Sequence, residues 1–408
     1  MVLLAGCQSI LGIEEGVLAE HAGGAAGAAG EPGSCTPPPE AAAGGAALSG
    51  LSLGWWSGCD SSDRCYSVGL PSQEDRPTDV ASSDDVPRFF VAIRSMRLGS
   101  RNEAGELDEQ AWRGLGLDLD GLCTSSSTCN LPGEPEMACS PHSSQTPDDG
   151  TYCRDNQVGR LDYTLDTLPL TAGVYMVTEP QFNCSLCQGA YNIIFAVSSY
   201  NGLPEDDSVR VDIYPSPGIA ELKPIDCSSS EWDGSGSCWT RDDVWGIQSS
   251  HVENTQPGPD PGPATYYDPA AFVRDGVIVA ALPENTPIWF PGDRAVNTVV
   301  PMVLHGGILI GRLAERTGEW EVTDGTLAGR TRKSDLIEGF GMLGVCEGEP
   351  AFTVIQSFVD TSADLMSTGA VAPDTPCDAL SVGFGFTASE ATVGPLVDVT
   401  ELTPCEPG

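Results

Sequence analysis

Two aspartates separated by one residue form the first set of side chains that could do chemistry. Asp118 and Asp120 stand in the run Gly116-Leu117-Asp118-Leu119-Asp120-Gly121, so in an extended chain both carboxylates lie on one face. Two like charges that close together need a cation, a water molecule or a hydrogen-bond donor between them. Asp155 and Asn156 follow in the same cysteine-rich part of the chain. Carboxylate and amide oxygens are ligands that calcium accepts, and we expect these four residues to hold Ca²⁺. The alternative is a solvated acidic turn.

A second carboxylate pair, Glu319 and Glu321, flanks Trp320. On a strand these two side chains point the same way at a separation of roughly 7 Å. That spacing is compatible with acid and base catalysis on a glycosidic bond, so a glycan hydrolase is one candidate function. An acidic edge strand explains the pair equally well.

Tryptophans cluster between a cysteine pair and a proline-rich loop, at Trp232, Trp239 and Trp245. Exposed aromatic rings beside a loop can stack on sugar rings, which together with the calcium site suggests a calcium-dependent carbohydrate-binding module. Tryptophan also packs against disulfides and fills small cores. We favour packing over sugar binding for these tryptophans, and we expect the same of Trp55 and Trp56.

The chain has 15 cysteines, and 14 remain if one carries another modification. Such a density is typical of an oxidising compartment and predicts disulfide bonds. Sequence proximity suggests the pairs Cys59–Cys65, Cys184–Cys187, Cys227–Cys238 and the longer closure Cys346–Cys377. A cluster of Cys123, Cys129, Cys139 and Cys153 leaves three connectivities open, and Cys35 and Cys405 could join the two ends. Zinc is an alternative for Cys184-Ser185-Leu186-Cys187, but a second half-site is missing.

The N-terminus carries a short motif, Leu4-Ala5-Gly6-Cys7, that resembles the lipobox of bacterial lipoproteins. The resemblance implies a diacylglycerol on Cys7, which would anchor the protein to the membrane. Ser9 at the second position after that cysteine favours the outer membrane over the inner one. Residues 1–7 are then the end of a signal peptide, and we expect its basic and apolar regions to begin further upstream. Residues 8–50 are rich in Gly, Ala and Pro and predict a flexible, disordered tether.

Charge narrows the set of partners. With 19 basic and 58 acidic side chains the formal net charge is −39. Nucleic-acid binding needs clustered Lys and Arg, so we expect no nucleic-acid partner. The same charge argues against docking on an anionic membrane surface, which leaves the lipid as the expected membrane contact.

The elements that must position these side chains are mostly strands. Apolar or alternating runs predict strands at 88–96, 190–200, 208–214, 276–282, 299–310, 320–323 and 380–386, with 326–332 as a continuation. Helices are expected only at 333–342, with Ser334 as its cap, and at about 352–366. Many short strands with Gly- and Pro-rich turns favour a mostly β fold, a jelly-roll or concanavalin-like β-sandwich over residues 51–408. The breaker-rich stretch 250–263 is a candidate boundary between two β domains.

Several short motifs together resemble a group of predicted lipoproteins of the myxobacterial type. They are Gly116 to Thr124, Arg154-Asp155-Asn156, Val197 to Gly202, Asp324 to Arg330 and Pro376 to Ser381. The resemblance implies a location in the cell envelope and a β architecture, and it implies no activity. We therefore expect a non-catalytic envelope lipoprotein that presents a binding or structural surface to a glycan or an envelope protein.

Overall fold

The computed structural model describes residues 67–399 and Cys405, except 79, 82, 125–134, 143–146, 168–177, 228–231, 254–259 and 292–298. The expectations for the lipobox at Cys7, the tether at 8–50, Trp55, Trp56 and the pair Cys59–Cys65 lie outside these residues. Among the described residues, no helix is long and apolar enough to cross a membrane.

The main element is an antiparallel sheet of nine strands in the order β10-β12-β1-β3-β4-β6-β7-β9-β8. Strand β9 also pairs with β10, so the order returns to its start and eight strands form a closed ring. Strand β8 extends the ring beside the first part of β9. The bounds are β1 (Phe89–Arg97), β3 (Asn192–Ser198), β4 (Asp206–Ser216), β6 (Tyr266–Arg274), β7 (Val277–Ala281), β8 (Thr286–Pro291), β9 (Val299–Arg316), β10 (Glu319–Arg332) and β12 (Ala379–Glu390).

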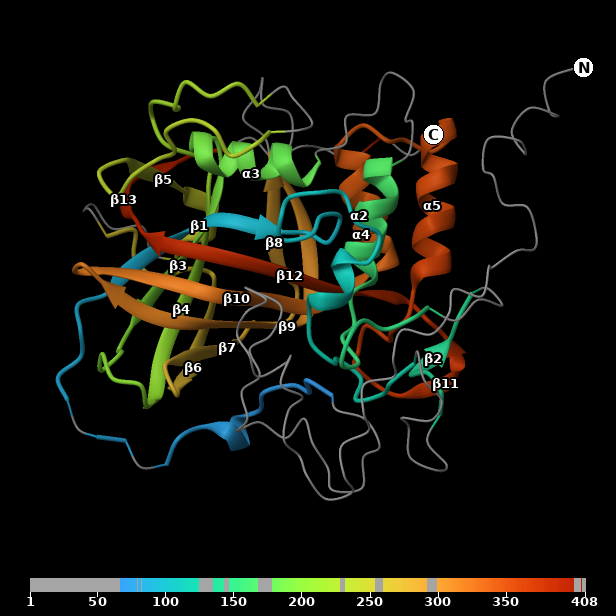
Figure 1. Cartoon of the computed structure of the whole chain (residues 1–408), viewed down its shortest axis with the longest axis horizontal. Coiled ribbons are helices and arrows are strands. Elements are labelled where there is room, and N and C mark those ends of the chain that lie inside the picture. Colours follow the sequence, from blue (N-terminus) through green and yellow to red (C-terminus); the bar gives the residue numbers. More distant parts are fainter. Residues whose placement is uncertain are drawn as a thin grey trace, which may run out of the picture.

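Strands on the two sides of the ring run in different directions. In Figure 1, β9, β10 and β12 run across the view, whereas β3 and β4 run up it behind them. Two layers whose strands cross in this way pack as an orthogonal sandwich whose corners are turned by bent strands. The mostly β fold class is therefore confirmed, and strands from before and after 250–263 share one sheet. Two small parallel pairs lie outside the ring: β2 (Cys139–Ser140) with β11 (Ala372–Pro376), and β5 (Val244–Gln248) with β13 (Thr392–Val397).

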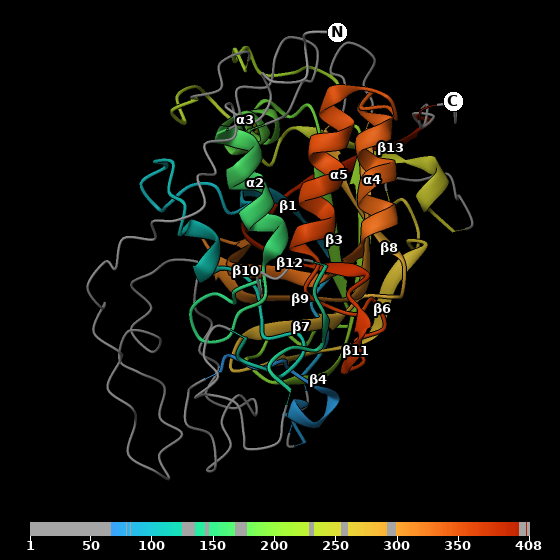
Figure 2. The same cartoon turned by 90° about the vertical axis from the view of Figure 1, so that its right-hand side faces the viewer.

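Four helices accompany the sheet: α2 (Gln157–Thr167), α3 (Glu179–Gln188), α4 (Lys333–Met342) and α5 (Pro350–Ser362). Helix α5 contacts both α2 and α4, and the three stand together at one end of the sheet in Figure 2. Short 3₁₀ turns form η1 (Gln73–Asp75), η2 (Ala111–Gly114) and η3 (Ser249–His251). The expected helix at 333–342 is confirmed, and the second expected helix is α5. The cap was wrong, because the N-cap is Arg332 and Ser334 instead bonds Asp335.

Apolar side chains divide between the interior of the ring and two outer layers. Alternate residues of β1, among them Phe89, Val91 and Ile93, point into the main core. Ala92 faces outward into a layer built on Trp239 and Trp245, which also contains Ile247 of β5 and Val393 of β13. A second outer layer joins the segment 117–122 to β6, β7, β9 and β10.

Ten cysteines are described, and all ten form disulfides: Cys123–Cys153, Cys139–Cys377, Cys184–Cys227, Cys187–Cys238 and Cys346–Cys405. The expectation of disulfides is confirmed, but the pairs Cys184–Cys187, Cys227–Cys238, Cys346–Cys377 and Cys35–Cys405 were wrong. The expected pairing within the cluster of four was also wrong, because Cys139 bonds Cys377 outside it. Cys184 and Cys187 lie on one helix, α3, and both reach the loop that contains Cys227 and Cys238. Proximity in sequence therefore predicted the wrong pairs, because helix α3 directs the sulfur atoms of Cys184 and Cys187 to another segment.

A close contact between two glycines docks the segment that carries Asp118 onto the ring. A Cβ added to Gly383 on β12 would lie 2.5 Å from the Cα of Gly116. Gly116 has a φ of +95°, a conformation that other residues rarely adopt. Only glycine at both positions allows this approach.

We expect Gly383→Ala to lower the free energy of unfolding by about 1–3 kcal/mol, because the added methyl group must push the docked segment away. Gly339→Ala is the matched control: it makes the same change inside helix α4, where the nearest atom lies 3.4 Å from the added Cβ. The control should be neutral or stabilising by up to about 1 kcal/mol. Denaturant unfolding of both variants measures this, and equal effects would contradict the docking role of Gly383.

Candidate functional site

The segment that carries Asp118 and Asp120 packs on the outer face of the ring. Leu117, Leu119 and Leu122 are buried in the outer layer shared with β6, β7, β9 and β10. The expected extended conformation was wrong, because the chain bends at residues 119–121 and the turn places the carboxylates of Asp118 and Asp120. The backbone of Asp155 pairs with Leu117, so the two parts of the expected site lie side by side.

Asp118, Asp120 and Asp155 converge, as their spacing suggested. One carboxylate oxygen from each lies within 4.8 Å of the others. Asp118 and Asp155 are buried, and Asp120 is partly buried. Three convergent carboxylates of this kind can bind a hard divalent cation through oxygen.

Backbone amides fix the orientation of each carboxylate. The Asp118 carboxylate accepts hydrogen bonds from the hydroxyl of Ser67 and from the N–H of Gly121, the latter at 2.7 Å. Asp120 Oδ1 accepts the N–H of Leu122 at 2.8 Å. Asp155 Oδ2 accepts the N–H of Leu119 at 2.6 Å. Each oxygen keeps a further lone pair, so these bonds orient the group and still allow it to coordinate a metal ion.

Two further aspartates and one arginine, which the sequence did not single out, surround the three. Asp149 accepts the N–H of Thr124 at 2.5 Å, and Asp364 is buried with its Oδ2 bonded to the Ser381 hydroxyl at 2.6 Å. Arg330 on β10 donates to the carbonyl of Leu119 at 2.5 Å. We call Asp118, Asp120, Asp149, Asp155, Asp364 and Arg330 the aspartate cluster.

Burial dominates the acid–base properties of the aspartate cluster. Loss of solvent raises the pKa of Asp118 to about 7, that of Asp120 to about 6, that of Asp149 to about 8 and that of Asp364 to about 7. Burial raises the pKa of Asp155 well above its usual value, and the charges of the neighbouring aspartates add to the effect. Desolvation lowers the pKa of Arg330. Near neutral pH the cluster therefore takes up protons or requires another positive charge.

Asn156, the fourth expected ligand, instead forms hydrogen bonds that hold helix α2 and strand β12 in place. Its Oδ1 accepts the N–H of Gly159 at 3.0 Å and that of Gly383 at 2.9 Å, while its Nδ2 donates to the carbonyl of Trp112 at 3.3 Å. The first of these bonds caps helix α2. Both lone pairs of the amide oxygen are used, so we assign Asn156 to the scaffold of the site.

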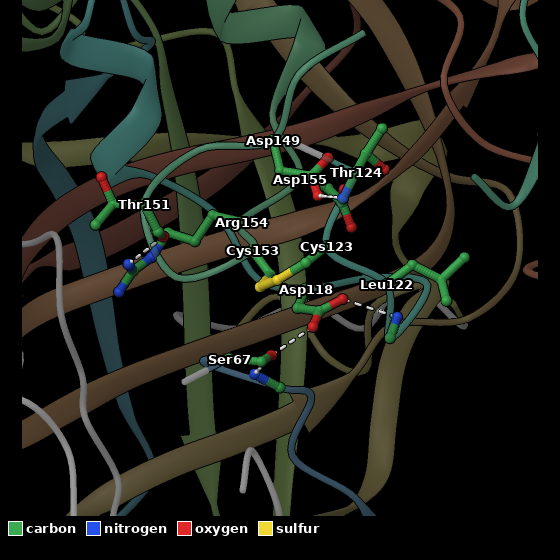
Figure 3. Close-up of a disulfide and its surroundings, with 12 residues drawn as sticks. Ser67, Asp118, Leu122, Cys123, Thr124, Asp149, Thr151, Cys153, Arg154 and Asp155 are labelled. Carbon is green, nitrogen blue, oxygen red and sulfur yellow. Dashed lines mark hydrogen bonds between the residues drawn. A yellow bond between two sulfur atoms is a disulfide. The ribbon is translucent and has the colours of Figure 1, made fainter. Parts of the chain in front are cut away.

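The disulfide Cys123–Cys153 holds the two segments of the site together. Figure 3 shows it among Asp118, Asp149 and Asp155. Cys123 follows the Asp118 segment, and Cys153 precedes Asp155 by two residues. The cross-link therefore fixes the spacing of carboxylates that are 30 or more residues apart in sequence.

The other candidate residues lie elsewhere. Glu319 and Glu321 are on β10, where Glu319 Oε1 lies 3.6 Å from Arg241 and Glu321 Oε2 lies 3.4 Å from Arg316. Each carboxylate is paired with an arginine at the surface, but the expected edge strand was wrong, because β10 pairs with both β9 and β12. Between them, Trp320 stacks on Phe89 with ring centroids 4.8 Å apart.

The tryptophans fill the outer core. Trp239 and Trp245 are fully buried and meet edge to face with ring centroids 5.2 Å apart. The packing interpretation is confirmed for these two, which leaves them no face for a sugar ring. Trp232 is partly buried, with its indole N–H bonded to the carbonyl of Ser235.

We expect the metal-free protein to become less stable as the pH rises from about 4 to about 8. A carboxyl group whose pKa is higher in the folded state than its unfolded value of about 3.9 binds more protons when folded, so the free energy of unfolding falls across this interval. The loss should amount to a few kcal/mol, since one pKa unit is worth about 1.4 kcal/mol. Denaturant unfolding in a chelating buffer measures it.

Asp120→Asn should flatten this pH dependence, because it removes one of the charges that repel each other. Asp374→Asn, which removes an exposed carboxylate on β11, is the control and should leave the pH dependence unchanged. Identical slopes in the two variants would show that the aspartate cluster does not set the pH dependence.

Comparisons with known proteins found no match to this chain, whether among protein-family models, curated proteins or solved structures.

Proposed function

We propose that this chain is a non-catalytic lipoprotein of the bacterial cell envelope whose cross-linked β body binds a calcium ion at Asp118, Asp120 and Asp155. The observation that carries the proposal is the convergence of these three carboxylates within 4.8 Å. The body then presents a calcium-stabilised surface to an envelope protein or a glycan outside the cytoplasm.

Electrostatics favours a cation at this place. The aspartate cluster sets five carboxyl groups against the single guanidinium of Arg330, so net negative charge remains even with Arg330 in position. Calcium takes six to eight oxygen ligands and tolerates irregular geometry, which suits carboxylates already held by backbone amides. Calcium sites of extracellular modules work at about 10⁻⁴ to 10⁻³ M, so moderate affinity is sufficient.

The disulfides indicate an oxidising compartment, either extracellular or periplasmic. The more specific proposal of an outer-membrane lipoprotein depends on Cys7. Five of the 15 cysteines lie outside the described residues, and lipidation of Cys7 would leave an even number for pairing. The resemblance to predicted myxobacterial-type lipoproteins supports the same location.

The two glycan functions have less support. Calcium-dependent carbohydrate binding would need exposed aromatic rings, but Trp239 and Trp245 are buried. A glycan hydrolase would need two carboxylates with different proton affinities, but Glu319 and Glu321 are engaged at the surface with separate arginines.

Calcium should bind with one ion per chain in isothermal titration calorimetry at pH 8. At about ten times the dissociation constant it should stabilise the fold by about 1.4 kcal/mol. At pH 5 the binding should weaken at least about tenfold, because protons compete for carboxyl groups with raised pKa values.

The matched variants separate this site from general screening of the acidic surface. Asp120→Asn should abolish the calcium response yet stabilise the metal-free protein at pH 8, because it relieves repulsion. Asp374→Asn should bind calcium like the wild type. Equal calcium binding by both variants would disprove the proposed calcium site.

Lipidation is tested separately, in a bacterial host with the chain joined to a complete signal peptide. Radiolabelled palmitate should be incorporated into the wild type and lost in Cys7→Ser. Incorporation that persists in Cys7→Ser would disprove anchoring at this cysteine and leave the calcium site unaffected.

A further inference from the structure

A cavity of about 150 Å³ lies away from the aspartate cluster, between helices α2 and α4 and the ring. Its walls are mainly apolar, from Leu161, Leu165, Phe182, Phe290, Phe340 and Phe384. The cavity is therefore built from α2, α3, β8, α4 and β12, which are far apart in sequence. A cavity of this volume with apolar walls is large enough for a benzene ring.

One carboxyl oxygen in the wall lacks a hydrogen bond, although Ser100 interacts with the same carboxyl group. Asp162 on α2 lines the cavity, and its Oδ2 is inaccessible to solvent and makes no hydrogen bond. An unsatisfied carboxyl oxygen at such a place costs free energy, so a ligand that donates a hydrogen bond to it gains that energy on binding. Burial and the nearby charge of Glu179 raise the pKa of Asp162 to about 8.

The second ionisable group in the wall, Asp335, is already satisfied. Its Oδ2 lies 3.0 Å from His305 Nε2, and its Oδ1 accepts the hydroxyl of Ser334 at 3.1 Å. Among the described residues that line the cavity, two are acidic and none is basic. The cavity thus combines apolar walls with one carboxyl oxygen that lacks a hydrogen bond, Oδ2 of Asp162. This combination is complementary to a molecule with an apolar body and one amino group.

We propose that this cavity binds a small apolar molecule that carries one amino group, with the ammonium donating a hydrogen bond to Asp162 Oδ2. The apolar body fills the space between the phenylalanine rings, and the ammonium provides a hydrogen bond to the one oxygen of Asp162 that makes none. A neutral apolar molecule gains only the free energy of filling the apolar space. A carboxylate would be repelled by the two acidic side chains in the wall, Asp162 and Asp335. This site is independent of calcium at the aspartate cluster.

Three probes of similar size test the proposal on the wild-type protein: benzylamine, toluene and benzoate. In calorimetry at pH 8, benzylamine should bind at least about tenfold more tightly than toluene, because a charge-assisted hydrogen bond contributes about 1.5–3 kcal/mol. Benzoate should not bind. Benzylamine no tighter than toluene, or binding of neither, would overturn the proposal without any variant.

Asp162→Asn then assigns the amine to its partner. Its affinity for benzylamine should fall at least about tenfold, while its affinity for toluene stays within about twofold of the wild-type value. Asp360→Asn removes a charge of α5 that is ion-paired with Lys333 at 3.2 Å, and it should change neither affinity. Unchanged benzylamine binding by Asp162→Asn would disprove the site.

Discussion

The pairing of β9 with β10 closes the ring, and the place of the aspartate cluster depends on it. The pairing runs from Arg316 with Glu319 to His305 with Arg330. Side chains alternate along β10, so Leu327 enters the main core while Ala328 and Arg330 face outward. Closure therefore places the guanidinium of Arg330 beneath the Asp118 segment, where it reaches the carbonyl of Leu119.

The outer apolar layer determines the electrostatic properties of the aspartate cluster, because it keeps the carboxyl groups partly out of water. Leu117 and Leu119 dock on the ring because burying them is favourable, and the adjacent Asp118 and Asp120 are carried into a partly dry environment. One guanidinium cannot neutralise five carboxyl groups, so the fold must accept protons or a metal cation. The raised pKa values of Asp118, Asp149 and Asp364 follow from this single conflict between apolar docking and charge.

Much of the fold could be predicted from local pattern, since the apolar runs at 88–96 and 299–310 correspond to β1 and β9. The convergence of Asp118 and Asp120 with Asp155 followed from spacing within one cysteine-rich region. Asp149 lies in the same region and was overlooked, whereas Asp364 and Arg330 could not be found that way because strand pairing brings them in from separate segments. Helix α2 was missed although its signals are present in the sequence: Asn156 is a good N-cap and the apolar residues that follow it have helical spacing.

Helix α2 connects the two proposed binding sites. It begins two residues after Asp155, at Gln157, and Asn156 at its cap is bonded to Gly383 on β12. Gln157 adds a bond from its N–H to the Ser381 hydroxyl at 2.8 Å. Asp162 lies in the second turn of α2 and lines the cavity from a helix whose start is fixed on β12. The contacts of Asn156 and Gln157 with β12 thus position the helix between the segment of Asp155 and the apolar cavity.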